Sequence, residues 1–219
     1  MNTSSLYNYI VIEGNIGAGK TTLATNIATD FNARLVLEQF AENPFLPKFY
    51  EDPEKHAFPL ELSFLAERYH QLKKEVTDQD IFKPAIISDY YFVKSLIFAQ
   101  SNLKEDEFAL YSKLFHIIND LLPKPDLFVY LYHIIDKLQE NIKKRGRSYE
   151  QNISDEYLIK IQKAYFDFFK QLPDLRILVL DVNNVDFANN SQDYELILNI
   201  IKKPYNAGVT NIIVKKEHP

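Results

Sequence analysis

The glycine-rich segment at residues 14–21 limits what this chain can fold into more than any other part of the sequence. It reads Gly-Asn-Ile-Gly-Ala-Gly-Lys-Thr and directly follows the apolar run at residues 9–12. A buried strand that opens into G-x-x-x-x-G-K-T and continues as a helix is typical of a phosphate-binding loop, whereas a chance glycine turn lacks this context.

Each residue type in this loop has a physical role. Glycine lets backbone N–H groups converge on phosphate oxygens, the lysine ammonium reaches the β- and γ-phosphates, and the threonine hydroxyl binds Mg²⁺. The segment therefore predicts a site for a nucleoside triphosphate and Mg²⁺. The residues predicted to bind the nucleotide are Gly14, Asn15, Ile16, Gly17, Ala18, Gly19, Lys20, Thr21 and Thr22.

Five short apolar runs alternate with stretches of helical pattern along the chain. Each run is almost continuously apolar, as expected for strands buried on both faces of a parallel sheet. The pattern predicts an α/β fold with a five-stranded, doubly wound parallel sheet flanked by helices. The predicted strands span residues 9–13, 34–38, 85–89, 127–131 and 176–181. The predicted helices span residues 20–31, 53–76, 91–101, 105–122, 135–144, 155–172 and 192–202.

Composition excludes several classes of protein. With 219 residues, of which 46% are hydrophobic and 25% charged, the chain suits one α/β domain with a complete core. A net charge of −5 argues against nucleic acid or an anionic membrane surface as a partner. The chain has no cysteine, no apolar stretch of the ~20 residues that span a bilayer, and no signal-peptide pattern at its start. We therefore expect a cytoplasmic enzyme.

Acidic residues close four of the predicted strands, at Glu13, Glu38, Asp89 and Asp181. In an open parallel sheet the ligand binds beyond the carboxyl ends of the strands, so these side chains are candidates for the site. An acid in this position can also cap the next helix or bind loop amides, and that alternative is favoured for Glu13 and Asp181.

Several segments beyond the glycine-rich loop resemble the deoxyribonucleoside kinase family, from residue 9 to about residue 186. They are Glu38, the segment 50–68, and the segment 145–150. Within the family, Phe-Pro-Leu-Glu-Leu-Ser-Phe-Leu at residues 58–65, Ile-Ser-Asp-Tyr at 87–90 and Ile-Phe-Ala at 97–99 are most similar to bacterial deoxyguanosine and deoxyadenosine kinases.

The resemblance implies a P-loop kinase fold that transfers the γ-phosphate of ATP to the 5′-hydroxyl of a deoxynucleoside. It implies one domain over residues 1–203, with an arginine-bearing lid at 145–153, and a C-terminal tail at 204–219. The residue pattern itself indicates a possible short strand within this tail, at 211–214. Kinases of this family dimerise through helices, so it also implies a homodimer, and the helices at 105–122 and 155–172 are apolar on more than one face. A thick helical layer would explain the same pattern. The apolar side chains that suggest it are Phe108, Tyr111, Leu114, Phe115, Ile118 and Leu122.

The resemblance also assigns roles on the donor side of the site. Glu38 occupies the position of the general base, Asp89 holds Mg²⁺ opposite Thr21, and Arg145 and Arg147 are the lid arginines that close over the phosphates. The catalytic set is therefore Lys20, Glu38, Arg145 and Arg147. Two positions depart from many relatives: Tyr90 stands where an arginine normally follows the acid, and Asn141 stands where some relatives carry a further arginine.

On the acceptor side, the resemblance places Glu38, Tyr50, Glu61, Arg68, Asp89 and Glu150 around the deoxynucleoside. Tyr50 and Glu150 would bind the 3′-hydroxyl. Glu61 and Arg68 lie two helical turns apart and so share one helix face. An ionised Glu61 would accept from the two adjacent donors of guanine, which favours deoxyguanosine over deoxyadenosine. The alternative is that Glu61 pairs with Arg68 or Lys94 and contacts no base.

Two other functions stay open at this point. A nucleoside monophosphate kinase shares the loop, sheet and lid, but it needs additional cations for the acceptor phosphate, and residues 38–68 contain few. A non-catalytic, nucleotide-binding regulatory subunit is suggested only by the missing arginines at residues 90 and 141.

Overall fold

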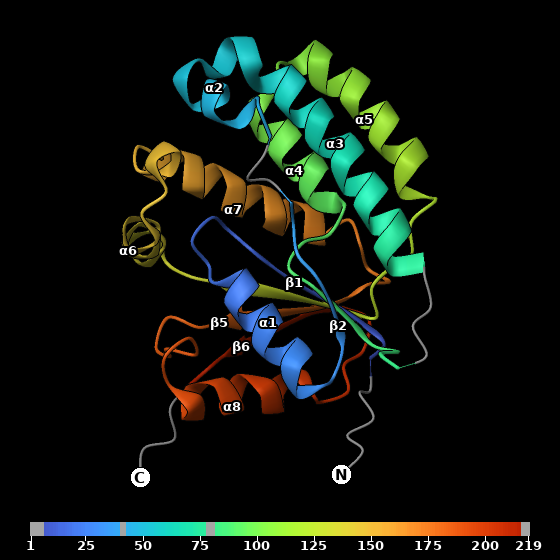
Figure 1. The fold of residues 1–219 in the computed structure, drawn as a ribbon, viewed down its shortest axis with the longest axis vertical. Helices are drawn as coiled ribbons and strands as arrows, with labels where there is room; N and C mark the ends of the chain where they lie inside the picture. The colour runs from blue at the N-terminus through green and yellow to red at the C-terminus, as the bar shows by residue number, and fades with distance from the viewer. Residues whose placement is uncertain (1–6, 40–42, 78–81, 216–219) are drawn as a thin grey trace.

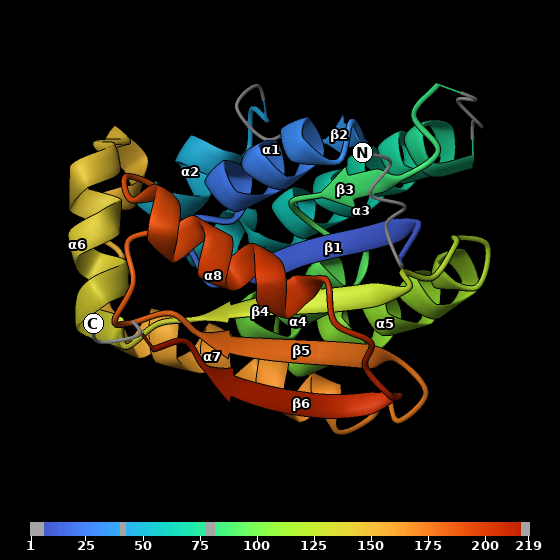
Figure 2. The same ribbon diagram turned by 90° about the horizontal axis from the view of Figure 1, so that it is seen from below.

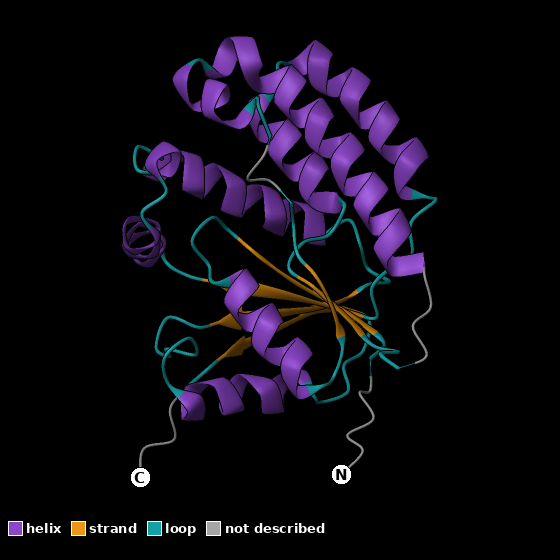
Figure 3. Cartoon of the chain, viewed as in Figure 1, coloured by secondary structure: helices purple, strands orange, loops and turns teal. Residues whose placement is uncertain are grey.

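The computed structural model describes residues 7–39, 43–77 and 82–215, and within them it has one parallel sheet between two layers of helices (Figures 1 and 3). The strands follow the order β2-β3-β1-β4-β5-β6. They are β1 (Tyr9–Gly14), β2 (Arg34–Val36), β3 (Ile86–Ser88), β4 (Leu127–Tyr132), β5 (Arg176–Asp181) and β6 (Gly208–Ile213). The helices are α1 (Lys20–Asp30), α2 (Leu46–Glu51), α3 (Pro53–Thr77), α4 (Val93–Asn102), α5 (Glu105–Asn119), α6 (Ile135–Arg145), α7 (Asp155–Phe169) and α8 (Ser191–Ile201). None of these helices is both long and apolar enough to cross a membrane.

The described residues form six strands, so the prediction of a five-stranded sheet was wrong. β6 pairs in parallel with β5 along its whole length, from Gly208 beside Arg176 to Ile213 beside Asp181. Its side chains alternate between half-buried and exposed because it is the edge strand, and the continuous apolar run that marks a central strand is therefore missing. The predicted tail at 204–219 thus contributes a strand to the sheet, and its last residues, 216–219, lie outside the described part.

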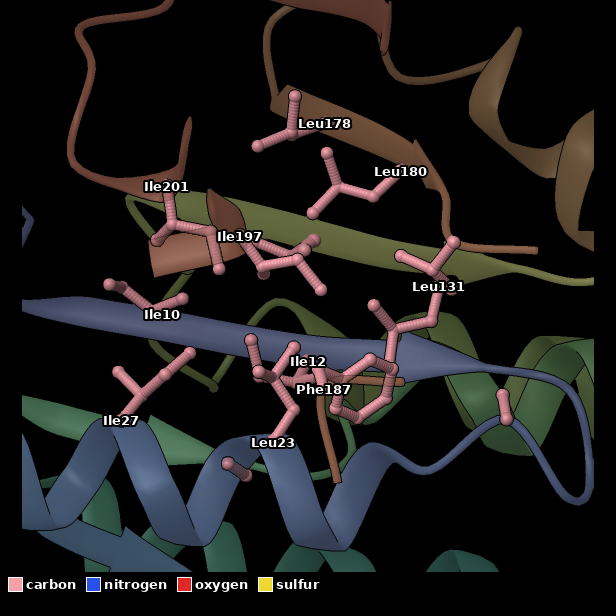
Figure 4. Packing of buried hydrophobic residues seen from close by; sticks show 14 of the residues in the cluster. Ile10, Ile12, Leu23, Ile27, Leu131, Leu178, Leu180, Phe187, Ile197 and Ile201 are labelled. Carbon is pink, nitrogen blue, oxygen red and sulfur yellow. The ribbon is translucent and has the colours of Figure 1, made fainter. Parts of the chain in front are cut away.

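The sheet separates two hydrophobic clusters. On one face, Ile10 and Ile12 of β1 pack with Leu23 and Ile27 of α1 and with α8 (Figure 4). On the other face lie α4, α5 and α7 (Figure 2). β1 and β4 pack against them through a largely aromatic cluster. Its fully buried large side chains include Tyr90, Phe92, Tyr111, Phe115, Phe128, Tyr130 and Tyr165. Both faces of the central strands are covered, which accounts for their continuous apolar sequence.

Strand order places the functional loops together. β1 lies between β3 and β4, and the connections run in opposite directions from it, so a crevice opens beyond the carboxyl end of β1. The glycine-rich loop fills this position, and α1 begins at Lys20 directly after it. Gly17 and Gly19 have φ of 82° and 83°. A Cβ at Gly17 would lie 2.8 Å from the Leu138 carbonyl oxygen, so this position requires glycine.

The two-faced burial of the sheet predicts the cost of core truncation. Leu180→Ala in β5, at a fully buried position, should lower the free energy of unfolding by about 2–5 kcal/mol, because it leaves a cavity. Val209→Ala in the edge strand β6, where the side chain is 44% exposed, should change it by less than about 1 kcal/mol. Urea denaturation measures both values. Equal losses in the two variants would contradict the assignment of β6 as a solvated edge.

Candidate active site

One cavity of about 850 Å³ lies at the carboxyl ends of the strands. It is lined by nearly all residues that the sequence analysis assigned to the site, from both the donor and the acceptor side. Gly14 and Asn15 are the exceptions. The Asn15 side chain is buried, and its Nδ2 donates to the Leu158 carbonyl oxygen at 2.8 Å, so it supports the loop from beneath.

Lys20 is held close to the glycine-rich loop. Its Nζ donates to the carbonyl oxygens of Gly14 and Asn15, each at 2.9 Å. Burial and the neighbouring Lys94 ammonium lower the pKa of Lys20 to about 8, although Glu13 and Glu38 act in the opposite direction. The lysine therefore lies under the phosphate cradle in a strongly desolvated environment.

Thr21 and Asp89 meet in the cavity, as predicted for a metal site. The Thr21 hydroxyl donates to Asp89 Oδ2 at 2.5 Å, while Asp89 Oδ1 accepts from the Glu38 backbone N–H at 2.7 Å. A hydroxyl oxygen and a carboxylate oxygen side by side are hard ligands that suit Mg²⁺. No group of three or more acidic, histidine or cysteine side chains in the described residues could form a complete metal cage.

Glu38 lies between two buried cations. Arg68 from α3 donates to Glu38 Oε1 through Nε at 2.9 Å and Nη2 at 2.7 Å. Lys94 from α4 donates to Glu38 Oε2 at 2.5 Å. Burial alone would raise the pKa of Glu38, but Lys94 and Arg68 outweigh it and hold the pKa at about 2. The carboxylate is therefore firmly ionised in the free protein.

This arrangement differs from the sequence interpretation of Arg68. Arg68 was grouped with Glu61 on one helix face, but its guanidinium binds Glu38 and donates to Ser95 Oγ. The alternative ion pair of Glu61 with Arg68 or Lys94 is not formed among the described residues, because Glu38 takes both cations. A buried negative charge is stabilised by the nearest cations, and these can come from different helices. Spacing along one helix therefore does not predict which side chains form ion pairs.

Tyr90, at the position where many relatives have an arginine, does not line the cavity. Its ring is fully buried, and its hydroxyl donates to Gln71 Oε1 at 2.8 Å. The cation beside Glu38 comes instead from Lys94, which lies in the first turn of α4. The sequence held one signal for it, a single lysine within the otherwise uncharged segment 92–101.

Glu61 lies at the acceptor end of the cavity and is 1% exposed. Its Oε1 accepts from Asn102 Nδ2 at 2.6 Å, whereas its Oε2 is buried without a hydrogen-bond partner in the described residues. Burial raises the pKa of Glu61 to about 7, against the opposing effects of Arg68 and Asn102. An unsatisfied buried carboxylate oxygen costs free energy, so this oxygen marks a place where a ligand donor would fit.

The lid residues converge on one acid. Arg145, at the end of α6, and Arg147 both donate to the carboxylate of Glu150, which lies in a short 3₁₀ turn at Ser148–Glu150. Tyr50 lies beside this turn, and its ring stacks on Tyr149 with centroids 5.9 Å apart. The residues predicted for the phosphates and for the sugar are therefore neighbours.

Sequence reasoning missed several contributions to the cavity. Among them are the position of Lys94 beside Glu38, Asn102, and the loop at residues 183–189, which lines the donor half beside the glycine-rich loop. It also treated Asn141 only as a missing arginine. In the structure, Asn141 Nδ2 donates to the Gly17 carbonyl oxygen at 2.8 Å and so links α6 to the phosphate-binding loop.

Known proteins resemble this chain over most of its length. It is 38% identical to a deoxyguanosine kinase of Bacillus subtilis, over 93% of this chain and 99% of the relative. It is 32% identical to a deoxyadenosine kinase of Dictyostelium discoideum, over 91% of this chain and 80% of the relative. A solved deoxyadenosine kinase from M. mycoides with bound dATP superposes with a TM-score of 0.76, at 28% identity, and covers 89% of this chain and 100% of that one.

The family model described as deoxynucleoside kinase matches residues 10–205, a span that contains the whole cavity. The glycine-rich loop, Glu38, Asp89 and the lid arginines lie in this span and line that cavity, as a phosphoryl-transfer site requires. The chain therefore belongs to the deoxynucleoside kinase family.

Proposed function

We propose that this protein is a purine deoxynucleoside kinase that uses ATP and Mg²⁺, favours deoxyguanosine, and also accepts deoxyadenosine. One observation carries the proposal: a single cavity joins a phosphate-binding loop to a buried acceptor end, with the Glu38 carboxylate between them. The named relatives, which include both deoxyguanosine and deoxyadenosine kinases, support a purine acceptor.

The proposed chemistry is direct in-line phosphoryl transfer. Glu38 accepts the proton of the 5′-hydroxyl, the sugar oxygen attacks the γ-phosphorus, and the bond to the β-phosphate oxygen breaks with its electron pair leaving on ADP. Lys20 and the lid arginines Arg145 and Arg147 lie where they would offset the negative charge on the transferring group. To contact the transferring group, the two arginines must release the Glu150 carboxylate and bind phosphate oxygens instead.

Thr21 and Asp89 are the residues proposed to hold Mg²⁺, because their oxygens already lie 2.5 Å apart. The bound ion would neutralise phosphate charge and orient the triphosphate. Tyr50 and Glu150 are proposed to bind the 3′-hydroxyl, since they line the same cavity beside the lid.

The base preference rests on the carboxyl group of Glu61. Asn102 occupies Oε1, which leaves the partnerless Oε2 as the atom available to a base. In its ionised form this oxygen accepts from guanine, which offers two adjacent donors. In its protonated form the group both donates and accepts, and so matches adenine. With a pKa of about 7 both forms are accessible, which supports the acceptance of both purines.

The pairing of the cations in the acceptor half argues against a nucleoside monophosphate as the acceptor substrate. Arg68 and Lys94 are both bound to Glu38, so neither is set aside for an acceptor phosphate. A purely regulatory role is disfavoured as well, because Lys20, Thr21, Glu38 and Asp89 meet in one cavity.

We further propose a homodimer through α5. Most of the apolar side chains offered for this role by the sequence face the core: Tyr111, Phe115 and Leu122 are buried, and Phe108 and Ile118 pack against them. An exposed stripe, which shares Leu114 with that set, runs along α5 and into the turn after it. Leu110, Leu114, Ile117 and Leu121 recur at intervals of four, three and four residues and are 54%, 37%, 68% and 65% exposed. An apolar stripe at helical spacing on a solvated helix suits burial against a second copy.

Glu38→Gln should abolish turnover while leaving ATP binding intact. An amide cannot accept the hydroxyl proton, so the rate should fall at least about 10²-fold. Monophosphate formation and nucleotide binding measured on the same preparation separate the two effects. Glu67→Gln, an exposed position on α3, is the control. Near-normal turnover of Glu38→Gln would eliminate Glu38 as the base.

Glu61→Gln should shift the ratio of kcat/KM for deoxyadenosine over deoxyguanosine upward, by about tenfold. The amide oxygen keeps the hydrogen bond from Asn102, so the amide nitrogen takes the place of Oε2. This nitrogen can donate to adenine but cannot accept from guanine. The assay is a panel of the four deoxynucleosides with ATP and Mg²⁺. An unchanged purine ratio would show that Glu61 does not read the base.

The raised pKa of Glu61 also predicts a pH effect on stability. Between about pH 4.5 and 7 the unfolded chain loses a proton that the folded chain keeps, so this group destabilises the fold as pH rises. The unfolding free energy of Glu61→Gln relative to wild type should therefore increase between about pH 5 and pH 8, by up to about 3 kcal/mol. Denaturant titrations at several pH values test this, and a flat difference would contradict the burial of an ionisable group there.

Ile117→Asp should convert the dimer to a monomer without loss of the fold, because the side chain lies at the centre of the exposed stripe. Ile159→Asp on α7, which is 52% exposed and lies outside the stripe, is the matched control. Sedimentation velocity reports the mass of each variant. A wild-type monomer, or dimers that survive Ile117→Asp, would argue against this interface.

A further inference from the structure

The two oxygens of Glu38 have different surroundings. Oε1 accepts two hydrogen bonds from Arg68, at 2.9 Å and 2.7 Å. Oε2 accepts one, from Lys94 at 2.5 Å. A carboxylate oxygen has two lone pairs. Both are used on Oε1, whereas one stays available on Oε2 for the hydroxyl of an acceptor.

The two cations are also held differently. The Arg68 guanidinium donates to Ser95 Oγ at 2.9 Å and lies 4.6 Å from the centre of the Phe64 ring. These contacts lock its position and, through it, the position of Oε1. Among the described residues, the Lys94 ammonium makes one hydrogen bond, to Oε2, and it lies 5.5 Å from the Phe98 ring centre. Arg68 is thus an anchor, while Lys94 is directed at the reactive oxygen.

We propose that Lys94 is a positioning residue for phosphoryl transfer: it orients Oε2 of Glu38 as the proton acceptor, while Arg68 holds Oε1 in place. The inference rests on the proposed role of Glu38 as the base. In the step, the 5′-hydroxyl proton moves to the free lone pair of Oε2, the sugar oxygen forms its bond to the γ-phosphorus, and the electron pair of the broken bond leaves on ADP. Lys94 keeps its own proton throughout.

This role differs from simple neutralisation of a buried charge. The Arg68 guanidinium already supplies one positive charge to Glu38 through two hydrogen bonds, so the carboxylate would not be left unpaired without Lys94. What only Lys94 supplies is a directional bond to Oε2. Its loss should therefore lower the rate of the chemical step more than it weakens substrate binding.

The test compares Lys94→Met with Lys94→Arg. Lys94→Met should lower kcat by about 10²-fold, and the KM for deoxynucleoside should stay within about threefold of wild type. Lys94→Arg restores a donor for Oε2, so its kcat should be at least about tenfold higher than that of Lys94→Met. The control is Lys170→Met, which removes an exposed lysine paired with Asp167 and should leave kcat unchanged. If Lys94→Met does not fold, Lys94→Leu, which also lacks a donor, replaces it.

Two results would overturn the proposal: a kcat within about threefold of wild type in Lys94→Met, or equal losses in Lys94→Met and Lys94→Arg. A double variant adds a second criterion. Because Lys94 acts through Glu38, adding Lys94→Met to Glu38→Gln should lower the residual rate by no more than about threefold. If the rate losses of the two single variants multiply in the double variant, Lys94 does not act through Glu38, and this result would also overturn the proposal.

The same measurements separate this inference from the proposed function. High turnover of Glu38→Gln alone would contradict the role of Glu38 as the general base, and with it the proposed mechanism. An inactive Glu38→Gln together with a fully active Lys94→Met leaves the kinase mechanism in place and removes only the role of Lys94.

Discussion

A buried carboxylate between two cations holds the acceptor half of this protein together. Glu38 follows β2, Arg68 comes from α3 and Lys94 from α4, so their ion pairs join the sheet to two helices of the upper layer in Figure 1. The backbone of Glu38 also donates to Asp89, which in turn accepts from Thr21 at the start of α1. One connected set of polar contacts therefore links the acceptor helices to the phosphate-binding loop. Because breaking a buried ion pair is costly, this set holds the proposed reacting groups in one arrangement.

A second buried acid plays a comparable part beneath the loop. Glu13, at the carboxyl end of β1, accepts from the Tyr91 backbone N–H and the Tyr165 hydroxyl, each at 2.9 Å. Burial raises the pKa of Glu13, although Lys94 and Lys20 act against it. These contacts tie β1 to the segment after β3 and to α7. Glu13 does not line the cavity, which agrees with the structural role favoured for it over a catalytic one.

Local sequence patterns predicted much of the architecture because local forces determine it. Continuous apolar runs identify strands covered on both faces, and the glycines at 17 and 19 mark left-handed backbone that other residues rarely adopt. The edge strand β6 gave a weaker signal, since only one side of it is covered. Most of the predicted site residues meet in one cavity, because loops at the carboxyl ends of neighbouring parallel strands necessarily lie together.

The sequence by itself determined the phosphate-binding loop, the α/β order of elements and the strand-end acids, because these depend on neighbours within a few residues. Only the tertiary structure decided which charges pair. It assigned Arg68 and Lys94 to Glu38, gave Asn102 to Glu61, and exposed an apolar stripe that shares only Leu114 with the residues first suggested. The physical reason is that buried charges and hydrogen-bond donors find partners across elements far apart in the chain, under desolvation costs that no local pattern records.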